Sequence, residues 1–458
     1  MNKSTQSPAS SQFCGELFSL SDANGKKLSS NFTAPDLSSF GGLLLLRECE
    51  KQIGFVSSLS SCIEDSRRSY LVRHSYEEML LQRIFQIAAG YEDCEDCDLL
   101  RNDSILKICA GRTSESDMLS SQPSMSRLEN KASIRELYNM GLCFVEHFIS
   151  SYGDKEPEVI ILDCDDSNAN TYGGQQLSLF NNYYGEYCYM PLFVFEGISG
   201  KMILPLLRPG RGNKSINIFG IMRRLIALLR KRWKHTRFIL RGDSHFCSKD
   251  FMDWAEDKEY VDFVTGLTGN SVLLKRVEKW LSNAQKEYNR TQTPIKTYHH
   301  FTYKAGSWKY VQRVVVKIEI GEMGSNIRFV VTSFKNTYAR TIYESLYCDR
   351  ARMELMIKEI KTYLYADRMS CQRFSANQFR LFIHAGAYVL LHTMKSELFA
   401  GTPVASFSIM TIREKILLTA VHLKELKTCI RIEFPAKQPM RKEMEYALHR
   451  IRYLHKTG

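Results

Sequence analysis

The chain has 458 residues, and its 62 Lys and Arg against 50 Asp and Glu give a formal net charge of +12. This length allows more than one hydrophobic core, and the positive charge favours a polyanionic partner, which argues against a glycosidase. No apolar run approaches the roughly 20 residues that span a bilayer, and the polar start predicts no signal peptide. Thirteen scattered cysteines, an odd number, indicate reduced thiols, so we expect a cytoplasmic protein.

The N-terminal third is predicted to be a helical domain that follows a polar arm. Residues 1–34 are rich in Ser, Asn and Thr, which predicts a mobile segment. Residues 35–156 show helical periodicity, and Ser133-x-x-Glu136 has the spacing of a capping box before a long apolar helix. This part of the chain carries no enzymatic signature.

Two hydrophobic runs farther along the chain end in aspartates. Residues 159–162 are apolar and lead into Asp163 and Asp165, and residues 238–240 lead into Asp243. Such runs are typical of buried strands, and strand alternation puts Asp163 and Asp165 on one face. Ligands of open α/β sheets gather at the carboxyl ends of strands, although an aspartate there can also serve as a turn or helix cap.

The segment between these two runs is strongly basic. Residues 201–240 contain eleven Lys and Arg and no Asp or Glu, and residues 218–233 are predicted to form a helix with its arginines facing outward. A charged face is often only solvated. Because this one lies between the two aspartates, we expect it to follow a phosphate backbone.

A β-meander is predicted after the second aspartate. Strand-like alternation runs through residues 301–303, 308–320 and 327–334, with a turn at 321–324. We therefore predict a β-rich insertion over residues 267–336.

One predicted helix then carries a glutamate among cations. Tyr347, Arg350, Glu354, Lys358 and Lys361 fall within roughly 80° of one another around a helix. Taken alone, they could form a solvated face held by weak i,i+4 ion pairs. Together with the two aspartates, however, Glu354 completes three separated carboxylates that can hold two divalent metals while the cations hold phosphates.

The pattern Tyr347-x2-Arg350-x3-Glu354-x6-Lys361 resembles the signature of the DDE transposases of bacterial insertion sequences, whose catalytic core is ribonuclease-H-like. The resemblance is greatest to the group numbered thirteen-eighty and covers about residues 35–395. It rests on motifs at residues 90–93, 121–130, 174–176, 207–210, 241–244 and 366–371.

The resemblance implies a catalytic triad of Asp165, Asp243 and Glu354. Asp163 is the alternative first ligand, but Asp165 is followed by Asp-Ser, which fits the family's pattern of Asp, small residue, Ser or Thr. The chain departs from the family at Tyr172, where a histidine is usual, and at residues 355–356, where Leu-Met replaces Asn-Arg.

The resemblance also implies the chemistry and the partners. The triad would bind two Mg²⁺ ions, with Mn²⁺ as a substitute, for DNA end cleavage by water and strand transfer by a 3′-hydroxyl. The partners would be double-stranded DNA, both terminal inverted repeats and target, and a second copy of the chain on the paired ends, at the bacterial nucleoid and with no membrane. Trp308 would stack on an extruded base, or else simply pack on the sheet. The candidate DNA contacts are Tyr347, Arg350, Lys358, Lys361, Arg208, Arg211, Arg241, Gln175, Gln176 and Trp308.

The predicted fold class is α/β, with a ribonuclease-H-like mixed sheet flanked by helices. The catalytic core would comprise residues 157–266 and 337–400, the second part carrying Glu354, around the β-rich insertion. A basic helical region would follow at residues 401–458. Two alternatives remain open: a DNA-binding protein that has lost catalysis, and a nuclease with the same core.

Overall fold

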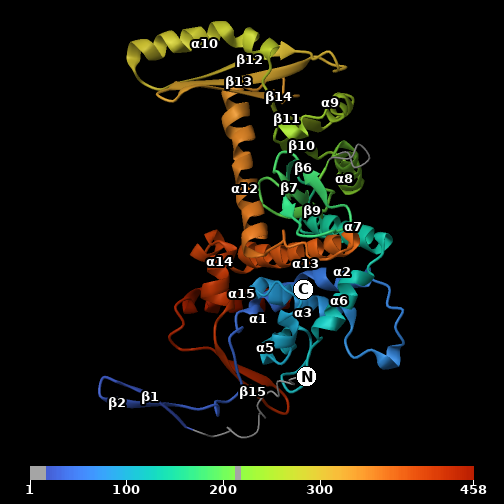
Figure 1. Cartoon of the computed structure of the whole chain (residues 1–458), viewed down its shortest axis with the longest axis vertical. Coiled ribbons are helices and arrows are strands. Elements are labelled where there is room, and N and C mark those ends of the chain that lie inside the picture. The colour runs from blue at the N-terminus through green and yellow to red at the C-terminus, as the bar shows by residue number, and fades with distance from the viewer. Residues whose placement is uncertain (1–16, 212–217, 458) are drawn as a thin grey trace, which may run out of the picture.

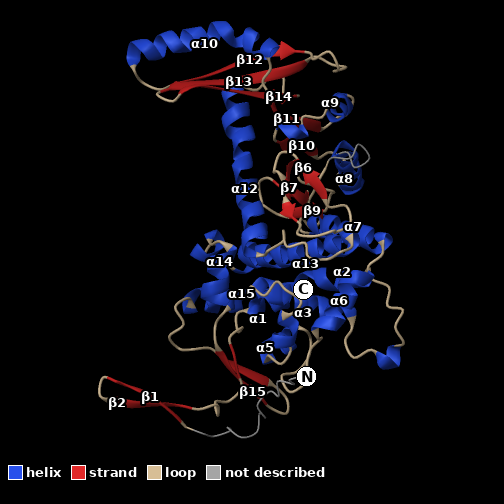
Figure 2. Cartoon of the chain, in the orientation of Figure 1, coloured by secondary structure: helices blue, strands red, loops and turns tan. Residues whose placement is uncertain are grey.

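The computed structural model describes residues 17–211 and 218–457. The strands of its largest sheet gather in one half of the molecule and most of its helices in the other, and a long helical rod runs between the far end of that sheet and the helical half (Figures 1 and 2). None of the described helices is long and apolar enough to cross a membrane.

The central sheet has eight strands in the order β12-β13-β14-β11-β10-β4-β8-β9. Strand β10 runs parallel to both β4 and β11, whereas β8 runs antiparallel to its neighbours β4 and β9. This order and these directions are those of a ribonuclease-H-type sheet, so the predicted mixed α/β fold is confirmed. The five core strands are β4 (Val159–Asp166), β8 (Leu192–Glu196), β9 (Met202–Leu206), β10 (Arg237–Gly242) and β11 (Val261–Leu267).

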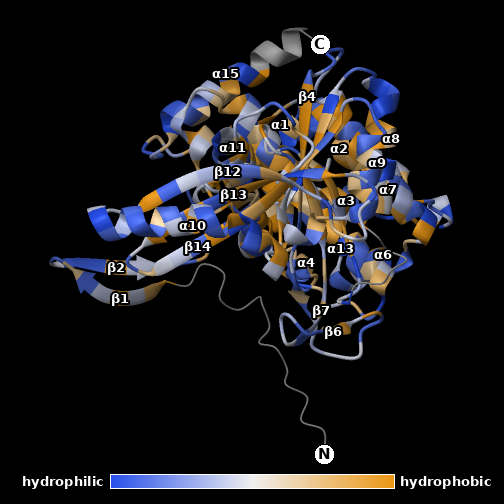
Figure 3. Ribbon diagram, turned by 90° about the horizontal axis from the view of Figure 1, so that it is seen from above, coloured by the Kyte–Doolittle hydropathy of each residue, from blue (hydrophilic) through white to orange (hydrophobic). Residues whose placement is uncertain are grey.

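Helices α8 (Ile218–Arg232) and α9 (Lys249–Glu256) share a hydrophobic core with this sheet. Helix α8 buries Met222, Leu225, Ile226 and Leu229 at helical spacing, and Arg223 and Arg224 are exposed, as the sequence predicted. Seen from above, apolar residues concentrate along the central strands, whereas the outer helices are mostly hydrophilic (Figure 3).

The predicted meander is present as three antiparallel strands, β12 (Ile295–Tyr303), β13 (Gln312–Gly321) and β14 (Gly324–Thr332). Two features differ from the expectation of a separate β-rich unit. A 21-residue helix, α10 (Ser271–Thr291), precedes the strands and packs on them. Furthermore, the last residues of β14 pair with β11, so the insertion continues the catalytic sheet.

The helical rod that follows β14 is irregular where the sequence predicted one regular helix. Its segments are α11 (Ala339–Thr341), a π-helical segment (Ile342–Tyr347), a 3-10 turn (Cys348–Arg350), α12 (Ala351–Lys358) and a second π-helical segment (Glu359–Tyr363). Tyr347 and Arg350 therefore lie where the hydrogen-bonding pattern changes, a feature that is frequent at functional sites.

The helical half combines the N-terminal domain with the C-terminal region in one core. Helix α13 lies at the centre of this core and is buried along almost its whole length. This burial explains why its sequence is apolar all round. The capping box of Ser133 and Glu136 forms as predicted. The helices are α1 (Leu43–Ile53), α2 (Phe55–Ser61), α3 (Tyr76–Ala89), α4 (Asp96–Leu100), α5 (Ser104–Cys109), α6 (Gln122–Lys131), α7 (Ile134–Ser150), α13 (Phe374–Thr393), α14 (Ile409–Ile412) and α15 (Arg441–Thr457).

Three small sheets lie outside the central one. The predicted N-terminal arm forms an exposed hairpin over part of its length, while its residues 1–16 lie outside the described part of the chain. The small sheets contain β1 (Phe18–Ala23) and β2 (Lys26–Ser30); β3 (Leu37–Ser38), β15 (Val421–Glu425) and β16 (Ile430–Glu433); and β5 (Ala169–Asn170), β6 (Leu179–Asn181) and β7 (Glu186–Tyr189).

Candidate active site

Asp165 and Asp243 lie at the carboxyl ends of adjacent strands. Strands β4 and β10 pair in parallel, with Leu240 opposite Leu162, so both strands end at the same edge of the sheet. Asp165 is the last residue but one of β4, and Asp243 follows β10 and accepts a hydrogen bond from the His245 backbone N–H at 2.8 Å. Parallel pairing thus brings together two carboxylates that are 78 positions apart in the sequence.

Arg350 links this edge of the sheet to the helical rod. Its Nη2 donates to Asp165 Oδ2 at 3.0 Å, and its Nη1 lies 4.0 Å from Glu354 Oε1. Burial lowers the pKa of Arg350, but the charges of Asp165 and Asp243 outweigh that effect and the net pKa is raised. One guanidinium therefore interacts with all three carboxylates that the sequence predicted as a triad.

The Asp165 carboxyl has a shifted pKa. Burial, opposed by Arg350 and reinforced by Asp243, raises its pKa to about 6. Asp165 therefore carries a proton in mild acid and is mostly ionised at neutral pH. Perturbed carboxyls beside a second carboxylate are typical of functional sites.

Asp163 has a different role from Asp165. It is fully buried and paired with Arg241, whose Nη2 lies 2.6 Å from Asp163 Oδ2 and whose Nη1 donates to the Leu346 carbonyl at 2.7 Å. Gly197 makes room for this pair, because a Cβ there would lie 2.7 Å from Arg241 Nη2. The prediction that Arg241 contacts DNA is wrong for this structure, since its guanidinium is enclosed in a structural ion pair.

Lys361 and Tyr347 support the loops that hold the aspartates. Lys361 Nζ donates to Ser167 Oγ and to the Asn168 carbonyl, both at 2.8 Å, directly after Asp165. The Tyr347 hydroxyl and the Ser244 backbone nitrogen both lie 2.9 Å from where Gly266 would carry a Cβ. The glycine therefore lets Tyr347 pack close to the Asp243 loop, whereas Lys358, on the same rod, is exposed.

The remaining predicted contacts divide into buried and exposed residues. Gln175 is buried and its amide donates to the Met369 and Cys371 carbonyls, which contradicts a role in contacting DNA. Gln176 is exposed, although its Oε1 accepts a bond from the Phe374 N–H. Arg208 pairs with Asp166 at 2.5 Å, and Arg211 is exposed.

Trp308 adopts the second of its two predicted roles. It is only 9% exposed and packs edge-on against Tyr303, with ring centroids 5.4 Å apart. Its ring is therefore part of the core of the insertion and is not presented to a base.

Sequence reasoning missed Asp166 and His245 as members of the site. His245 Nδ1 lies 3.4 Å from Asp243 Oδ2, and Asp166 contributes to the raised pKa of Asp165. Their adjacency to the two predicted ligands is the signal that could have found them.

Several motifs behind the family resemblance meet away from the carboxylates, in a buried ionic cluster of the helical half. Glu129 lies 3.6 Å from Arg83 Nε and 3.5 Å from Arg380 Nη1, and all three side chains are nearly inaccessible. Arg368 binds Glu92 at 2.6 Å on its border. These motif residues therefore hold the helical half together.

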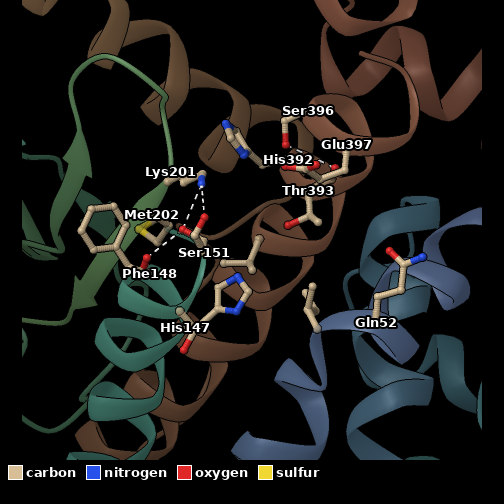
Figure 4. Close-up of a pocket in the computed structure, with 13 residues that line it drawn as sticks. Gln52, His147, Phe148, Ser151, Lys201, Met202, His392, Thr393, Ser396 and Glu397 are labelled. Atoms are coloured by element: carbon tan, nitrogen blue, oxygen red, sulfur yellow. Dashed lines mark hydrogen bonds between the residues drawn. The ribbon is translucent and has the colours of Figure 1, made fainter. Parts of the chain in front are cut away.

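A separate cavity of about 390 Å³ lies between α7, β9 and the end of α13 (Figure 4). His147 and His392 line it, and burial lowers the pKa of each to about 4. On one wall, Lys201 Nζ donates to Ser151 Oγ at 2.9 Å. The cavity is distinct from the carboxylate site.

Comparison with protein families identifies the chain. The profile described as "Transposase DDE domain group 1" matches residues 20–456. The chain belongs to this family. It is therefore a DDE transposase, and enzymes of this class act on DNA and use divalent metal ions.

A search of curated proteins gave no match. Among solved structures, a cryo-EM structure of a piggyBac transposase synaptic complex with hairpin DNA aligns with a TM-score of 0.40 and 10% identity, over 91% of this chain and 84% of that chain.

The carboxylates of this transposase fit a hard divalent cation in donor type, because Mg²⁺ and Ca²⁺ prefer carboxylate oxygens. Over residues 17–211 and 218–457, however, no three His, Cys, Asp or Glu side chains lie close enough together to form a metal site. The Glu354 side chain is 66% exposed and meets Asp165 only through Arg350. Asp165 and Asp243 are therefore held at the edge of the sheet, whereas Glu354 is exposed on the rod.

Proposed function

We propose that this chain is the transposase of a bacterial insertion sequence of the group numbered thirteen-eighty, acting at the nucleoid in the cytoplasm. It binds the terminal inverted repeats of its element and catalyses DNA end cleavage and strand transfer. The observation that carries the proposal is Arg350, which interacts with Asp165, Asp243 and Glu354 at the edge where β4 and β10 end.

In this proposal Asp165, Asp243 and Glu354 hold two Mg²⁺ ions, for which Mn²⁺ can substitute. When bound, such ions activate a water or a 3′-hydroxyl and stabilise the leaving oxygen of the phosphodiester. Asp165, with its pKa of about 6, presents a carboxylate at neutral pH, as metal binding requires.

The cations of the site bind and orient the DNA backbone. Arg350 is placed to pair with a phosphate once it is released from Asp165, and exposed Lys358 adds charge one helical turn beyond Glu354. Lys361 fixes the loop after Asp165, and Tyr347 braces the loop after Asp243. These two residues thus keep the fixed aspartates in position.

The DNA partner extends beyond the cleavage site. The exposed arginines of α8 supply a phosphate-tracking surface, and the helical domain of residues 35–156 binds the terminal repeats. Two copies of the chain act together on the paired ends.

The test is metal-dependent cleavage of a plasmid that carries the element's own ends. Wild type should cut at the end boundaries in Mg²⁺ or Mn²⁺ and not in EDTA. Asp243→Asn and Glu354→Gln should abolish cutting while end binding persists. Asp349→Asn, which changes an exposed acid on the same rod, serves as the matched control and should cut normally.

A second candidate function is sequence-specific DNA binding without catalysis. The separation of Glu354 from the aspartates favours it, as does the exposed apolar Leu355 beside Glu354. End binding without cutting by wild type would support this alternative, whereas cutting without preference for the ends would indicate a nuclease.

A further inference from the structure

We propose that Cys62 and Cys143 form a reversible disulfide when the protein meets a peroxide, and that this bond fastens helix α2 to helix α7. The two sulfurs lie 3.2 Å apart, although the residues are 81 positions apart in the sequence. Both side chains are half-buried, so an oxidant in solution can reach them. This inference concerns the helical half and does not depend on the proposed function.

The two helices direct both thiols toward one carbonyl group. Cys62 follows the last residue of α2, and Cys143 lies in the middle of α7. The Ser58 carbonyl oxygen lies 3.4 Å from Cys62 Sγ and 3.5 Å from Cys143 Sγ, and it accepts from both. The sulfurs therefore face each other, and an approach of about 1.2 Å would bring them to bonding distance.

Contacts on either side hold the two segments together. At the start of α2, Phe55 packs edge-on against Phe144, with ring centroids 5.0 Å apart. Beyond the end of α2, the Glu64 backbone N–H donates to Glu136 Oε1 at 2.9 Å. The thiol pair lies between these contacts, so disulfide formation requires little rearrangement of the backbone.

The reaction begins at Cys62. The hydrogen bond with Cys143 lowers the pKa of Cys62, although burial and Glu146 oppose this effect, and the same bond raises the pKa of Cys143. Thiolates are the nucleophiles in thiol oxidation, so Cys62 attacks first. Its sulfur takes one oxygen of hydrogen peroxide, the O–O bond breaks, and the products are a sulfenic acid at Cys62 and, with one proton taken up, water.

The second thiol completes the bond. The Cys143 sulfur attacks the sulfenic sulfur, the S–O bond breaks, and the hydroxyl group leaves with the thiol proton as a second water. Two thiols are thereby oxidised to one disulfide while the peroxide is reduced to water. Because Cys143 is already in contact, the reaction stops at a state that a thiol reductant reverses, before Cys62 reaches the irreversible sulfinic acid.

The Cys94-x-x-Cys97 motif is built differently. Cys94 donates to Glu129 Oε1 at 3.1 Å and Cys97 to Gln86 Oε1 at 3.2 Å, so the two thiols are directed to different acceptors. Burial raises the pKa of Cys97 to about 12 and also raises the pKa of Cys94. These thiols therefore stay protonated at neutral pH, although their spacing is the more conspicuous in the sequence.

The experiment treats the reduced full chain with a small excess of hydrogen peroxide, blocks the remaining thiols with N-ethylmaleimide and digests the protein without reductant. We expect mass spectrometry to find two peptides joined through Cys62 and Cys143, and dithiothreitol to separate them. The exposed Cys348 should carry the maleimide instead. Alkylation of both Cys62 and Cys143 under conditions that oxidise Cys348 would overturn the inference.

Single variants test the order of the steps. In Cys143→Ser, whose hydroxyl can still donate to Cys62, the sulfenic acid should accumulate at Cys62 and be trapped by dimedone. In Cys62→Ser, dimedone labelling of Cys143 should be at least about 10-fold slower. Cys429→Ser, which removes an exposed thiol, should form the disulfide as wild type does. Equal labelling rates in the two single variants would overturn the assignment of Cys62 as the nucleophile.

Thermal unfolding tests whether the bond fastens the two helices. A disulfide between residues 81 positions apart restricts the unfolded chain, so oxidation should raise the melting temperature of wild type by about 5 °C or more. Cys62→Ser should show no such rise at the same peroxide concentration. Equal melting temperatures of the reduced and the cross-linked protein would overturn the stabilising role of the bond.

Discussion

The buried ionic cluster around Glu129 and the carboxylate edge around Asp165 use the same chemistry for different ends. Each sets arginines 3 to 4 Å from carboxylates. The Glu129 side chain is 2% exposed and lies between two arginines, whereas Glu354 is 66% exposed and shares one arginine with two aspartates. The closed cluster has no access for a ligand, so it stabilises the fold, while the open one retains exchangeable partners.

The same contrast recurs within one strand. Asp163 and Asp165 share a face of β4, yet Asp163 is sealed against Arg241 and Asp165 is reached by Arg350 from the rod. The difference is the depth at which each side chain lies in the sheet. Strand alternation alone therefore cannot separate a structural aspartate from a proposed ligand.

The largest expected effect is at the carboxylate edge around Asp165. Asp165→Asn should lower end cleavage at least about 1,000-fold, or about 4 kcal/mol of transition-state stabilisation, because a neutral amide is a poor ligand for Mg²⁺. Its melting temperature should stay near that of wild type. Single-turnover cleavage and thermal unfolding measure the two quantities, and a large loss of stability with cleavage retained would reverse the assignment.

The closed cluster should show the opposite pattern. Glu129→Gln leaves Arg83 buried without its ion-pair partner and leaves Arg380 with the more distant Asp93, at 3.9 Å, which should cost about 3–5 kcal/mol of unfolding free energy. Urea unfolding measures this cost, and Glu146→Gln, an exposed acid of the same helical half, is the control. A shift no larger than that of the control would mean that the cluster is not structural.

Glu50 is another buried carboxyl, and its effect on stability should depend on pH. Burial raises its pKa to about 7, against the ordinary value of 4.5. Between pH 4.5 and pH 7, Glu50 therefore holds a proton in the folded chain but has lost it in the unfolded chain. The free energy of unfolding consequently falls as pH rises from about 4.5 to about 7, by up to about 3 kcal/mol. Unfolding measured across this range should show a weaker decline in Glu50→Gln, and an identical decline would contradict the buried proton.

Gly266 tests how tightly the open site is positioned. A methyl group there would lie 2.9 Å from the Ser244 nitrogen and from the Tyr347 hydroxyl, so the Asp243 loop must shift in Gly266→Ala. We expect cleavage to fall about 10- to 100-fold, the usual consequence of misplacing a reacting group by an ångström or less. Gly306→Ala, where a methyl group meets open space, should cut normally.

The smallest effect concerns Lys358. Lys358→Ala should reduce the slope of log affinity against log salt by about 1, because one phosphate contact is lost. Lys358→Arg should keep the wild-type slope. Filter binding over a range of salt concentrations decides between them, and an unchanged slope in both variants would remove Lys358 from the DNA surface.

The sequence was most informative where the determining interactions are local or periodic. The capping box at Ser133, the strand ends at Asp165 and Asp243, and the meander of β12 to β14 all follow from short patterns. Helix α10 also has such a pattern, with Leu273, Val277 and Ala284 on its buried face, although the prediction for this segment is a β-rich insertion.

Burial by distant partners could not be predicted. Arg241 meets Asp163 across 78 residues, and the Gln175 amide meets Met369 across 194. Both residues belong to family motifs and are polar, so sequence reasoning assigned them to the DNA surface.

The pairing of strand β14 with two neighbours limits how the insertion can change length. It is unbroken from Gly324 to Thr332, pairing with β13 along its length and with β11 at its end. Because side chains alternate faces along a strand, removing a single residue would invert every side chain beyond the cut. Natural variants should therefore lengthen or shorten this hairpin by even numbers of residues, with matched changes in β13, or else carry a bulge that restores the phase.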